Sequence, residues 1–225
     1  MAIVLSAGVH TLVALMAAER HGKVRPTPAE CGRPDGDTPM DALDLLLGRA
    51  SASRLTDPAP APAELDIMFQ AALRAPDHGR LRPWDFVVIA GEHRTGFGEL
   101  LAASYARREP DAPPESLQRE RDKALRAPLI VVVAARVHKG HKIPEAEQIA
   151  SAAAAAQNLL LAAYAQGYGA IWRTGAPAYD PAIAQGLGLG PDASIVGFLY
   201  LGTRASDPMP TQRPATPDHV RIWQG

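Results

Sequence analysis

The chain has 225 residues, of which 47% are hydrophobic, so it can bury a substantial core within one domain. Its formal net charge of −1 gives no overall basic field, which argues against nonspecific binding to nucleic acid or to an acidic membrane. The single cysteine, Cys31, excludes an intrachain disulfide, and no Cys/His set has the spacing of a zinc site. We therefore expect a globular, metal-free protein of a reducing compartment, the cytoplasm.

The first 39 residues are expected to lie outside the folded domain. Residues 2–18 are apolar, but no basic segment precedes them and no small-residue cleavage site follows them, so they do not form a signal peptide. They are also fewer than the roughly 20 apolar residues that a membrane span needs. The stretch that follows is rich in Pro, Gly and charge, as linkers are. We predict a dispensable helix and tether over 1–39 and one domain over 40–225.

From residue 40 onward the chain alternates between helical and strand-like patterns. In the first predicted helix, "DALDLLLGR", Leu43, Leu46 and Leu47 share one face. Short β-branched or aromatic runs predict buried strands, and amphipathic patterns predict the other helices. The expected strands are 85–90, 129–135 and 195–202, and the expected helices are 62–74, 93–107 and 115–126.

The segment 145–166 predicts a long helix that is apolar nearly all round. Only Ser151, Gln157 and Asn158 interrupt its apolar and alanine-rich surface after the first turn. A helix without a polar face has to be covered on all sides, by a sheet, by another subunit or by both. The predicted fold is therefore α+β, a three-layer α-β-α sandwich with a mixed sheet around a long buried helix.

Three arginine-bearing segments are candidates for binding. They are "RASASR" (49–54), "RAPDHGRLRPW" (74–84) and "GYGAIWRTG" (167–175). Together they offer guanidinium groups, serine hydroxyls, an aromatic wall and the backbone amides of a Gly-rich turn. This inventory suits a flavin mononucleotide.

Each candidate also has a purely structural explanation. Arg49 can complement a helix C-terminus, His78 can be an ordinary turn residue, and Trp172 can belong to the core. Other cofactors fit less well, because the chain has neither G-x-G-x-x-G after a strand nor a nucleotide P-loop. "GLGLGPD" (186–192) follows a helix-like stretch and is interpreted as a loop. Hydrolase motifs such as G-x-S-x-G and H-E-x-x-H are absent from the sequence.

The order of several motifs resembles the FMN-dependent NAD(P)H nitroreductase family, in particular its short single-domain bacterial members. The motifs are "LLLGRASASR", "ALRAPDHGRLRPWDFVVI", "APLIVVVAA", "AAYAQGYGAIWRTGA" and "IVGFLYLGT", which together span Met40 to about Thr203. The resemblance implies a homodimer with two FMN sites at its interface. It also implies that the flavin contacts come from Arg49, Ala50, Ser51, Trp172, Arg173 and Thr174 of one subunit and from Arg74 and His78 of the other.

The same resemblance implies a reaction. Hydride passes from NAD(P)H to flavin N5 and then to a nitroaromatic or quinone-type acceptor in a ping-pong sequence, and no protein side chain is catalytic. No nucleic acid, membrane or metal takes part. The nicotinamide contacts would fall on Ala162, Ala163, Tyr164, Ala165, Gln166 and Gly167.

The chain departs from the family pattern at two positions. Ala50 stands where the family has a second arginine, so only its backbone can serve, and Ser53 stands where some members carry a basic residue. Arg54 is a candidate substitute. Two other functions stay open: a flavoprotein dehydrogenase of another substrate, and a flavin-binding protein without enzymatic activity.

Overall fold

The computed structural model describes residues 40–206 and 219–224. The predicted helix and tether of residues 1–39, with Cys31, lie outside this range. The helices are α2 (Ala42–Gly48), α3 (Pro62–Ala72), α4 (His93–Arg108), α5 (Pro114–Asp122), α6 (Glu145–Ala165) and α7 (Pro181–Gly186), with short 3₁₀ turns η2 (His78–Arg80), η3 (Lys123–Leu125) and η4 (Ala176–Tyr179). The strands are β1 (Leu55–Thr56), β2 (Trp84–Ala90), β3 (Leu129–Arg136), β4 (Gly169–Arg173) and β5 (Ala193–Arg204).

The five strands form one sheet whose order is β1-β5-β3-β2, with β4 also paired to β5. In the central pairs, Val131 of β3 lies opposite both Val88 of β2 and Leu199 of β5. The α+β class is confirmed. The strand directions differ from the expected mixture, because every strand pair in the described part of the chain is antiparallel.

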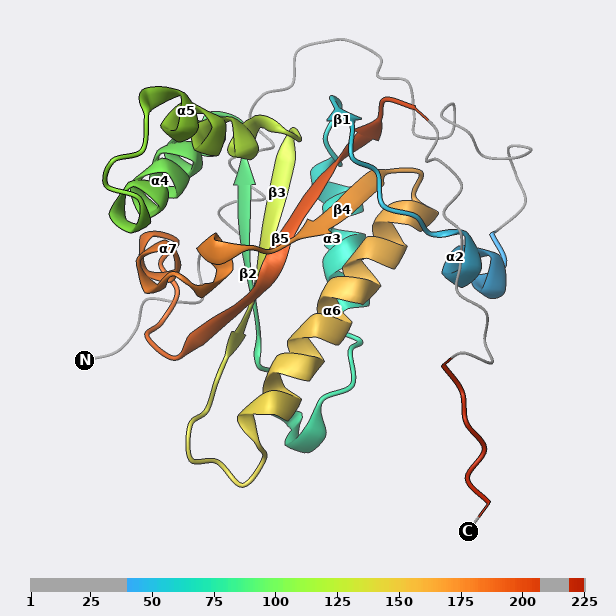
Figure 1. Cartoon of the computed structure of the whole chain (residues 1–225). Coiled ribbons are helices and arrows are strands. Elements are labelled where there is room, and N and C mark those ends of the chain that lie inside the picture. Colours follow the sequence, from blue (N-terminus) through green and yellow to red (C-terminus); the bar gives the residue numbers. More distant parts are fainter. Residues whose placement is uncertain (1–39, 207–218, 225) are drawn as a thin grey trace.

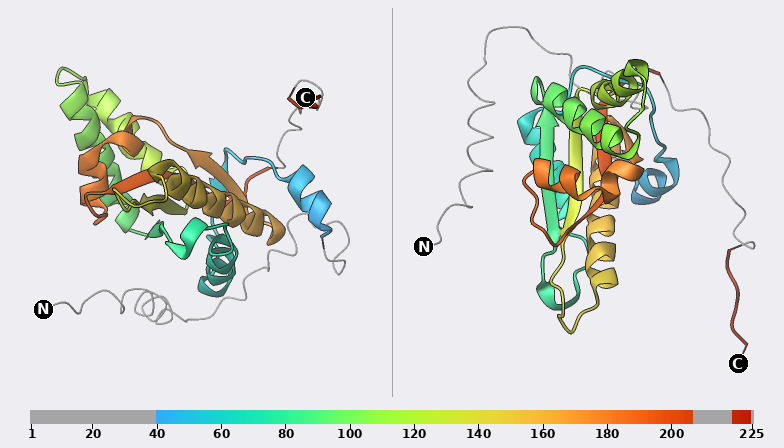
Figure 2. Two further views of the ribbon diagram at one scale, coloured as in Figure 1. Left: turned by 90° about the horizontal axis from the view of Figure 1, so that it is seen from below. Right: turned by 60° about the vertical axis from the view of Figure 1, so that its left-hand side comes forward.

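Helices cover both faces of the sheet, as the three-layer prediction requires (Figures 1 and 2). Side chains alternate along β3, so Val131 and Val133 join the core with α3 and α6, whereas Ile130 and Val132 join the core with α4, α7 and η4. Because both faces are covered, residues 129–135 are all buried, which explains the unbroken apolar run in the sequence. We call the two sides the α6 face and the α4 face.

Helix α6 is buried along one side only within this chain. Ala155 and Leu159 are fully buried against the sheet and α3, but Ala153 and Leu161 are half-exposed and Gln157 is exposed. Complete burial of this helix is therefore not reached in one chain. Among the described helices, none combines the length and the apolar character that crossing a membrane requires.

Helix α2 exposes the apolar face that its sequence predicts. Leu43, Leu46 and Leu47 lie on the surface of the described chain, with exposures of 65%, 54% and 74%. The helix itself is capped as its sequence suggests, since the Asp41 carboxylate accepts a hydrogen bond from the Leu43 N–H at 2.8 Å. The predicted helix is thus confirmed, and its apolar face is not covered within the described chain.

Candidate functional site

The arginine-rich loop between α3 and β2 is held in an unusual backbone conformation. Gly79, Arg80 and Arg82 all have positive φ angles, which non-glycine residues adopt rarely. The Asp77 carboxylate compensates by accepting hydrogen bonds from two backbone N–H groups, those of Leu81 at 3.2 Å and Arg82 at 2.7 Å. The loop is thus a fixed structure that presents its cations at the surface.

Contacts with the N-terminal half of α6 fix the position of this loop. The Ser151 hydroxyl donates to the Pro76 carbonyl at 2.7 Å and accepts from the Trp84 indole N–H at 3.1 Å. His78 Nδ1 lies 2.6 Å from a Glu147 carboxylate oxygen near the start of the helix. The polar interruption that Ser151 makes in an apolar helix therefore serves to anchor the loop.

The predicted binding segment 49–54, which forms the loop after α2, runs along the edge of β4. The Ala52 N–H donates to the Ala170 carbonyl at 3.0 Å, and Ala52 is buried. Gly169 permits this approach, because a Cβ there would lie 2.6 Å from Leu55 and 3.0 Å from Ala52. Upstream of this anchor, Arg49 and Ala50 are half-buried and the Ser51 side chain is exposed.

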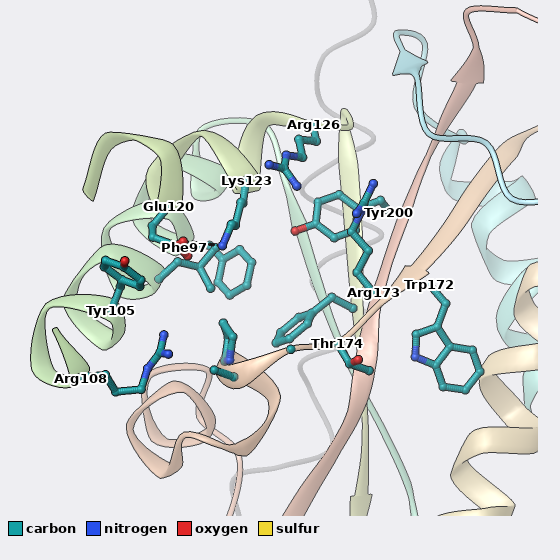
Figure 3. A pocket seen from close by; sticks show the side chains of 15 residues that line it. Phe97, Tyr105, Arg108, Glu120, Lys123, Arg126, Trp172, Arg173, Thr174 and Tyr200 are labelled. Carbon is teal, nitrogen blue, oxygen red and sulfur yellow. Dashed lines mark hydrogen bonds and ion pairs between the residues drawn. The ribbon is translucent and has the colours of Figure 1, made fainter. Parts of the chain in front are cut away.

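The segment expected to supply a Gly-rich turn contains strand β4, which sequence analysis missed. Strand alternation places the neighbours Trp172 and Arg173 on opposite faces of the sheet. The Trp172 indole lies on the α6 face and donates to the Val196 carbonyl at 3.3 Å. Figure 3 shows this ring directed away from the Arg173 side chain, which lies on the α4 face. Only backbone groups of Arg173 remain for a ligand on the α6 face.

The predicted residues are spread along α6 within one chain. Gly48, next to Arg49, lies against the Tyr164 ring at the C-terminal end of α6. A Cβ added to Gly48 would lie 3.3 Å from the Tyr164 hydroxyl. His78 contacts Glu147 at the N-terminal end. At a rise of about 1.5 Å per residue these two positions are about 25 Å apart along the helix. The structure brings Arg49–Ser51 and Trp172–Thr174 to one edge of the sheet. His78 lies far from this edge, and Arg74 is exposed at a position between the two ends of α6.

The segment 162–167, proposed to contact nicotinamide, forms the end of α6. Ala163 is fully buried, and the Gly167 and Tyr168 N–H groups donate to the Tyr164 and Ala163 carbonyls, each at 2.9 Å. Gln166 donates from its side chain to the Glu64 carbonyl at 3.2 Å. The Tyr164 ring lies 4.6 Å below the Arg204 guanidinium. Ala162 and Ala165 stay half-exposed, so they and backbone groups are what this segment offers to a ligand.

A pocket of about 510 Å³ opens on the α4 face beside the end of β4 (Figure 3). Thr174 and Gly175 form part of its rim, and Arg173 points into it. Sequence analysis missed its other polar residues, which come from α4, from α5 with the η3 turn and the residue after it, and from β5: Tyr105, Arg108, Glu120, Lys123, Arg126 and Tyr200. In residues 40–206 and 219–224, no three His, Cys, Asp or Glu side chains gather in a way that would hold a metal ion.

Comparison with known proteins adds independent information. Residues 46–203 match the model of the nitroreductase family. The chain is 43% identical over 164 residues to the "putative NAD(P)H nitroreductase YdjA" of Escherichia coli K12, an alignment that covers 73% of this chain and 88% of that one. Among solved structures it resembles a nitroreductase-like family protein from Bacillus cereus, with 26% identity, a TM-score of 0.75 and coverage of 84% and 99%. It shares its fold with the FMN and NADPH-dependent nitroreductase NfnB from Sphigopyxis sp. strain HMH, with 21% identity, a TM-score of 0.67 and coverage of 83% and 100%.

Proposed function

Because the chain belongs to the nitroreductase family of oxidoreductases, we propose that it is an FMN-dependent NAD(P)H oxidoreductase. It takes hydride from the nicotinamide and delivers it to a nitroaromatic or quinone-type acceptor in a ping-pong sequence. The observation that carries the proposal is the edge of the sheet where the Ala52–Ala170 hydrogen bond joins the Arg49–Ser51 loop to the Trp172–Thr174 strand end. The name of the fold relative NfnB, which gives FMN and NADPH as its dependence, agrees with the choice of cofactor.

The groups at this edge fit a flavin mononucleotide. The half-buried Arg49 supplies a guanidinium, Ser51 an exposed hydroxyl, and Trp172 a half-buried aromatic wall. Beyond β4 the backbone amides of Thr174 and Gly175 follow, and Gly175, at φ 92°, makes the turn there. Guanidinium, hydroxyl and amide donors are the groups that bind phosphate and the flavin carbonyls. Ala50 contributes its backbone only.

Bound FMN would supply the redox chemistry of this site, in which N5 exchanges hydride with the substrates. The protein would bind and orient the ring, donate hydrogen bonds to it from the end of β4, and place the positive charge of Arg49 near the negative charge of the cofactor. The Trp172 indole would lie against one side of the flavin ring. No protein proton donor is needed at the reacting atom, so no side chain is assigned a catalytic role.

The site is shared between two chains. Within one chain His78 lies about 25 Å along α6 from the Arg49 loop, whereas two copies of α6 packed antiparallel about a two-fold axis would place the N-terminal end of one beside the C-terminal end of the other. The half-exposed Ala153 and Leu161 and the exposed α2 leucines supply apolar surface for such an interface. Arg74 and His78 of one subunit would then reach the flavin held by the other.

The nicotinamide would approach at the end of α6. Ala162 and Ala165 are half-exposed there and lie near the Arg49 loop through the Gly48–Tyr164 contact. The structural roles of Ala163 and Gln166 limit their side chains to supporting this turn. Donor and acceptor would use this same approach in turn, which is the basis for the ping-pong sequence.

The absorption spectrum of the purified protein tests the proposal. The protein should purify yellow, should release FMN rather than FAD on heating when analysed by liquid chromatography, and should bleach when NADPH or NADH is added without oxygen. Steady-state oxidation of NAD(P)H should then accelerate with a nitroaromatic compound or a quinone. Bleaching without acceleration by either acceptor would favour a dehydrogenase of another substrate, and flavin binding without bleaching would favour a non-enzymatic flavoprotein.

A further inference from the structure

The pocket on the α4 face carries an excess of positive charge that the proposed flavin site does not use. Arg108 of α4, Lys123 of η3, Arg126 directly after η3, and Arg173 of β4 all line it. Glu120 is the one carboxylate in its lining, and it pairs with Lys123 at 2.5 Å. In the described chain the other three cations thus lack a carboxylate partner within the pocket, which leaves an electrostatic field that favours an anion.

Arg173 gives the clearest indication of a binding site in this pocket. Its Nε is buried and has no hydrogen-bond partner among the described residues. A buried donor without a partner costs roughly 1–3 kcal/mol, and native structures rarely leave one unsatisfied. The Arg173 side chain extends into the pocket, so an anion bound there can accept from the guanidinium (Figure 3).

Tyr200 lies next to this guanidinium and adds a neutral donor. Burial raises the pKa of Tyr200, and the nearby Arg126 and Arg173 oppose the shift only in part. The hydroxyl is therefore protonated at neutral pH and can donate a hydrogen bond. Figure 3 shows Arg126, Tyr200 and Arg173 gathered at one end of the pocket, where they form a set of two guanidinium groups and one hydroxyl.

The rest of the pocket is suited to an aromatic group. Phe97 and Tyr105 of α4 and Phe198 of β5 contribute rings to its lining. Phe97 and Phe198 pack against each other with centroids 5.7 Å apart, and the Arg108 guanidinium lies 5.5 Å above the Tyr105 ring. Rings held in this way form a preorganised wall for a planar ligand.

From these groups we propose that the α4-face pocket binds a small aromatic anion, a carboxylate or a phosphate monoester. The anionic group lies among Arg126, Arg173 and Tyr200, and the ring lies against Phe97 and Tyr105. The pocket adjoins the proposed flavin site at the end of β4, where Trp172, Thr174 and Gly175 also line it, but the Arg173 guanidinium enters it on the face of the sheet opposite the Trp172 indole. The proposal does not depend on the proposed enzymatic function.

Calorimetric titration of the full-length protein with phenyl phosphate and with benzoate tests the proposal, and neutral benzamide serves as the reference compound. We expect one saturable site per chain for the two anions, weakened by added salt, and much weaker binding of benzamide. Arg126→Met should weaken phenyl phosphate binding about tenfold, because it removes a charge-assisted hydrogen bond. Tyr200→Phe should weaken it roughly three- to tenfold while keeping the ring.

Arg121→Met is the matched control. Arg121 pairs with Glu99 at 2.8 Å and lies outside the pocket. Its substitution by methionine removes the same charge as Arg126→Met does. Binding should be unchanged in this variant, and phenyl phosphate should bind the FMN-loaded protein without releasing FMN. Equal losses in Arg121→Met and Arg126→Met would reduce the effect to general surface charge. Release of FMN by phenyl phosphate would assign the pocket to the flavin site, and the absence of saturable binding up to about 10 mM would overturn the proposal.

Discussion

The two faces of the sheet differ in how their functional groups are assembled. On the α6 face the groups proposed for the flavin come from motifs that are each continuous in sequence, and the proposed second chain would bring the two ends of α6 together. On the α4 face one chain gathers Arg108, Lys123, Arg126 and Arg173 from three separate segments into a single pocket. The boundary between the two faces runs through β4, where Trp172 and Arg173 are neighbours in sequence and face opposite sides. Adjacency in a motif thus does not imply adjacency at a site.

The difference between the two faces is tested most strongly by replacing one arginine on each of them. Arg49→Ala should weaken FMN affinity roughly ten- to hundredfold, since a charge-assisted hydrogen bond contributes about 1.5–3 kcal/mol. Arg173→Met should cause a clearly smaller loss, because its side chain lies on the α4 face, and should instead weaken binding of phenyl phosphate. Fluorescence titration of the apoprotein with FMN measures both affinities. Equal losses of FMN affinity in the two variants would place both guanidinium groups at the flavin.

A second prediction concerns the close packing that supports Trp172 on the α6 face. A Cβ on Gly197 of β5 would lie 2.1 Å from the Trp172 Nε1 and 3.1 Å from the Arg173 carbonyl oxygen. Gly197→Ala should therefore displace the indole and lower the free energy of unfolding by about 1–3 kcal/mol, the usual cost of overpacking. Gly190→Ala, with open space around its Cβ, is the control and should change it by less than about 0.5 kcal/mol. Urea denaturation followed by circular dichroism makes the comparison, and equal stabilities would contradict it.

On the α4 face, stability should depend on pH through Asp180. This carboxylate accepts hydrogen bonds from Ser104, from the Ala182 N–H at 2.9 Å and from Arg107 at 2.8 Å, and so joins α4 to the start of α7. The Ser104 hydroxyl, then the Ala182 N–H and Arg107, hold the pKa of Asp180 below its ordinary value against the effect of burial. A lowered pKa in the folded state means that this contribution is present above the unfolded-state pKa and is lost as the pH falls through the folded-state value.

Asp180→Asn should accordingly cost about 1 kcal/mol of stability at neutral pH. The difference from the unchanged protein should shrink in acid, below the ordinary pKa of an aspartate. Thermal denaturation at a series of pH values measures the difference. A gap that stays constant from neutral pH into acid would mean that the charge of Asp180 does not contribute.

Patterns that depend on local periodicity allowed most of the fold to be predicted from sequence. The apolar run of β3 identifies that strand, because burial on two faces leaves no polar alternation, and the length of the apolar, alanine-rich run 145–166 identifies α6 as a helix. Strand β4 was missed because "GAIWR" is short and lies between glycine-containing turns, which local rules assign to a loop. The surface position of Leu43 and Leu47 was not predicted either, since periodicity indicates an apolar face without indicating what covers it.

The candidate site could be predicted only in part for a related reason. Resemblance to a family identifies Arg49 and His78 as residues, but their separation along α6 becomes visible only when the loops are placed on the helix. The pocket of the α4 face has no sequence signature, because Arg126 and Tyr200 are brought together by the pairing of β3 with β5 and the packing of η3. Charges that meet through tertiary packing leave no local pattern.

The central claim, a flavin site divided between two chains, is tested most directly by complementation. One variant carries Arg49→Ala and the other carries both Arg74→Ala and His78→Ala, so each homodimer is defective in both of its sites. In a mixed dimer one site collects all the lesions and the other is intact, so NAD(P)H oxidation should recover after subunit exchange to about half of the unmodified dimer's activity. A monomer by light scattering, or no recovery in verified mixed dimers, would contradict the shared site and leave the loop of residues 74–84 to its own subunit.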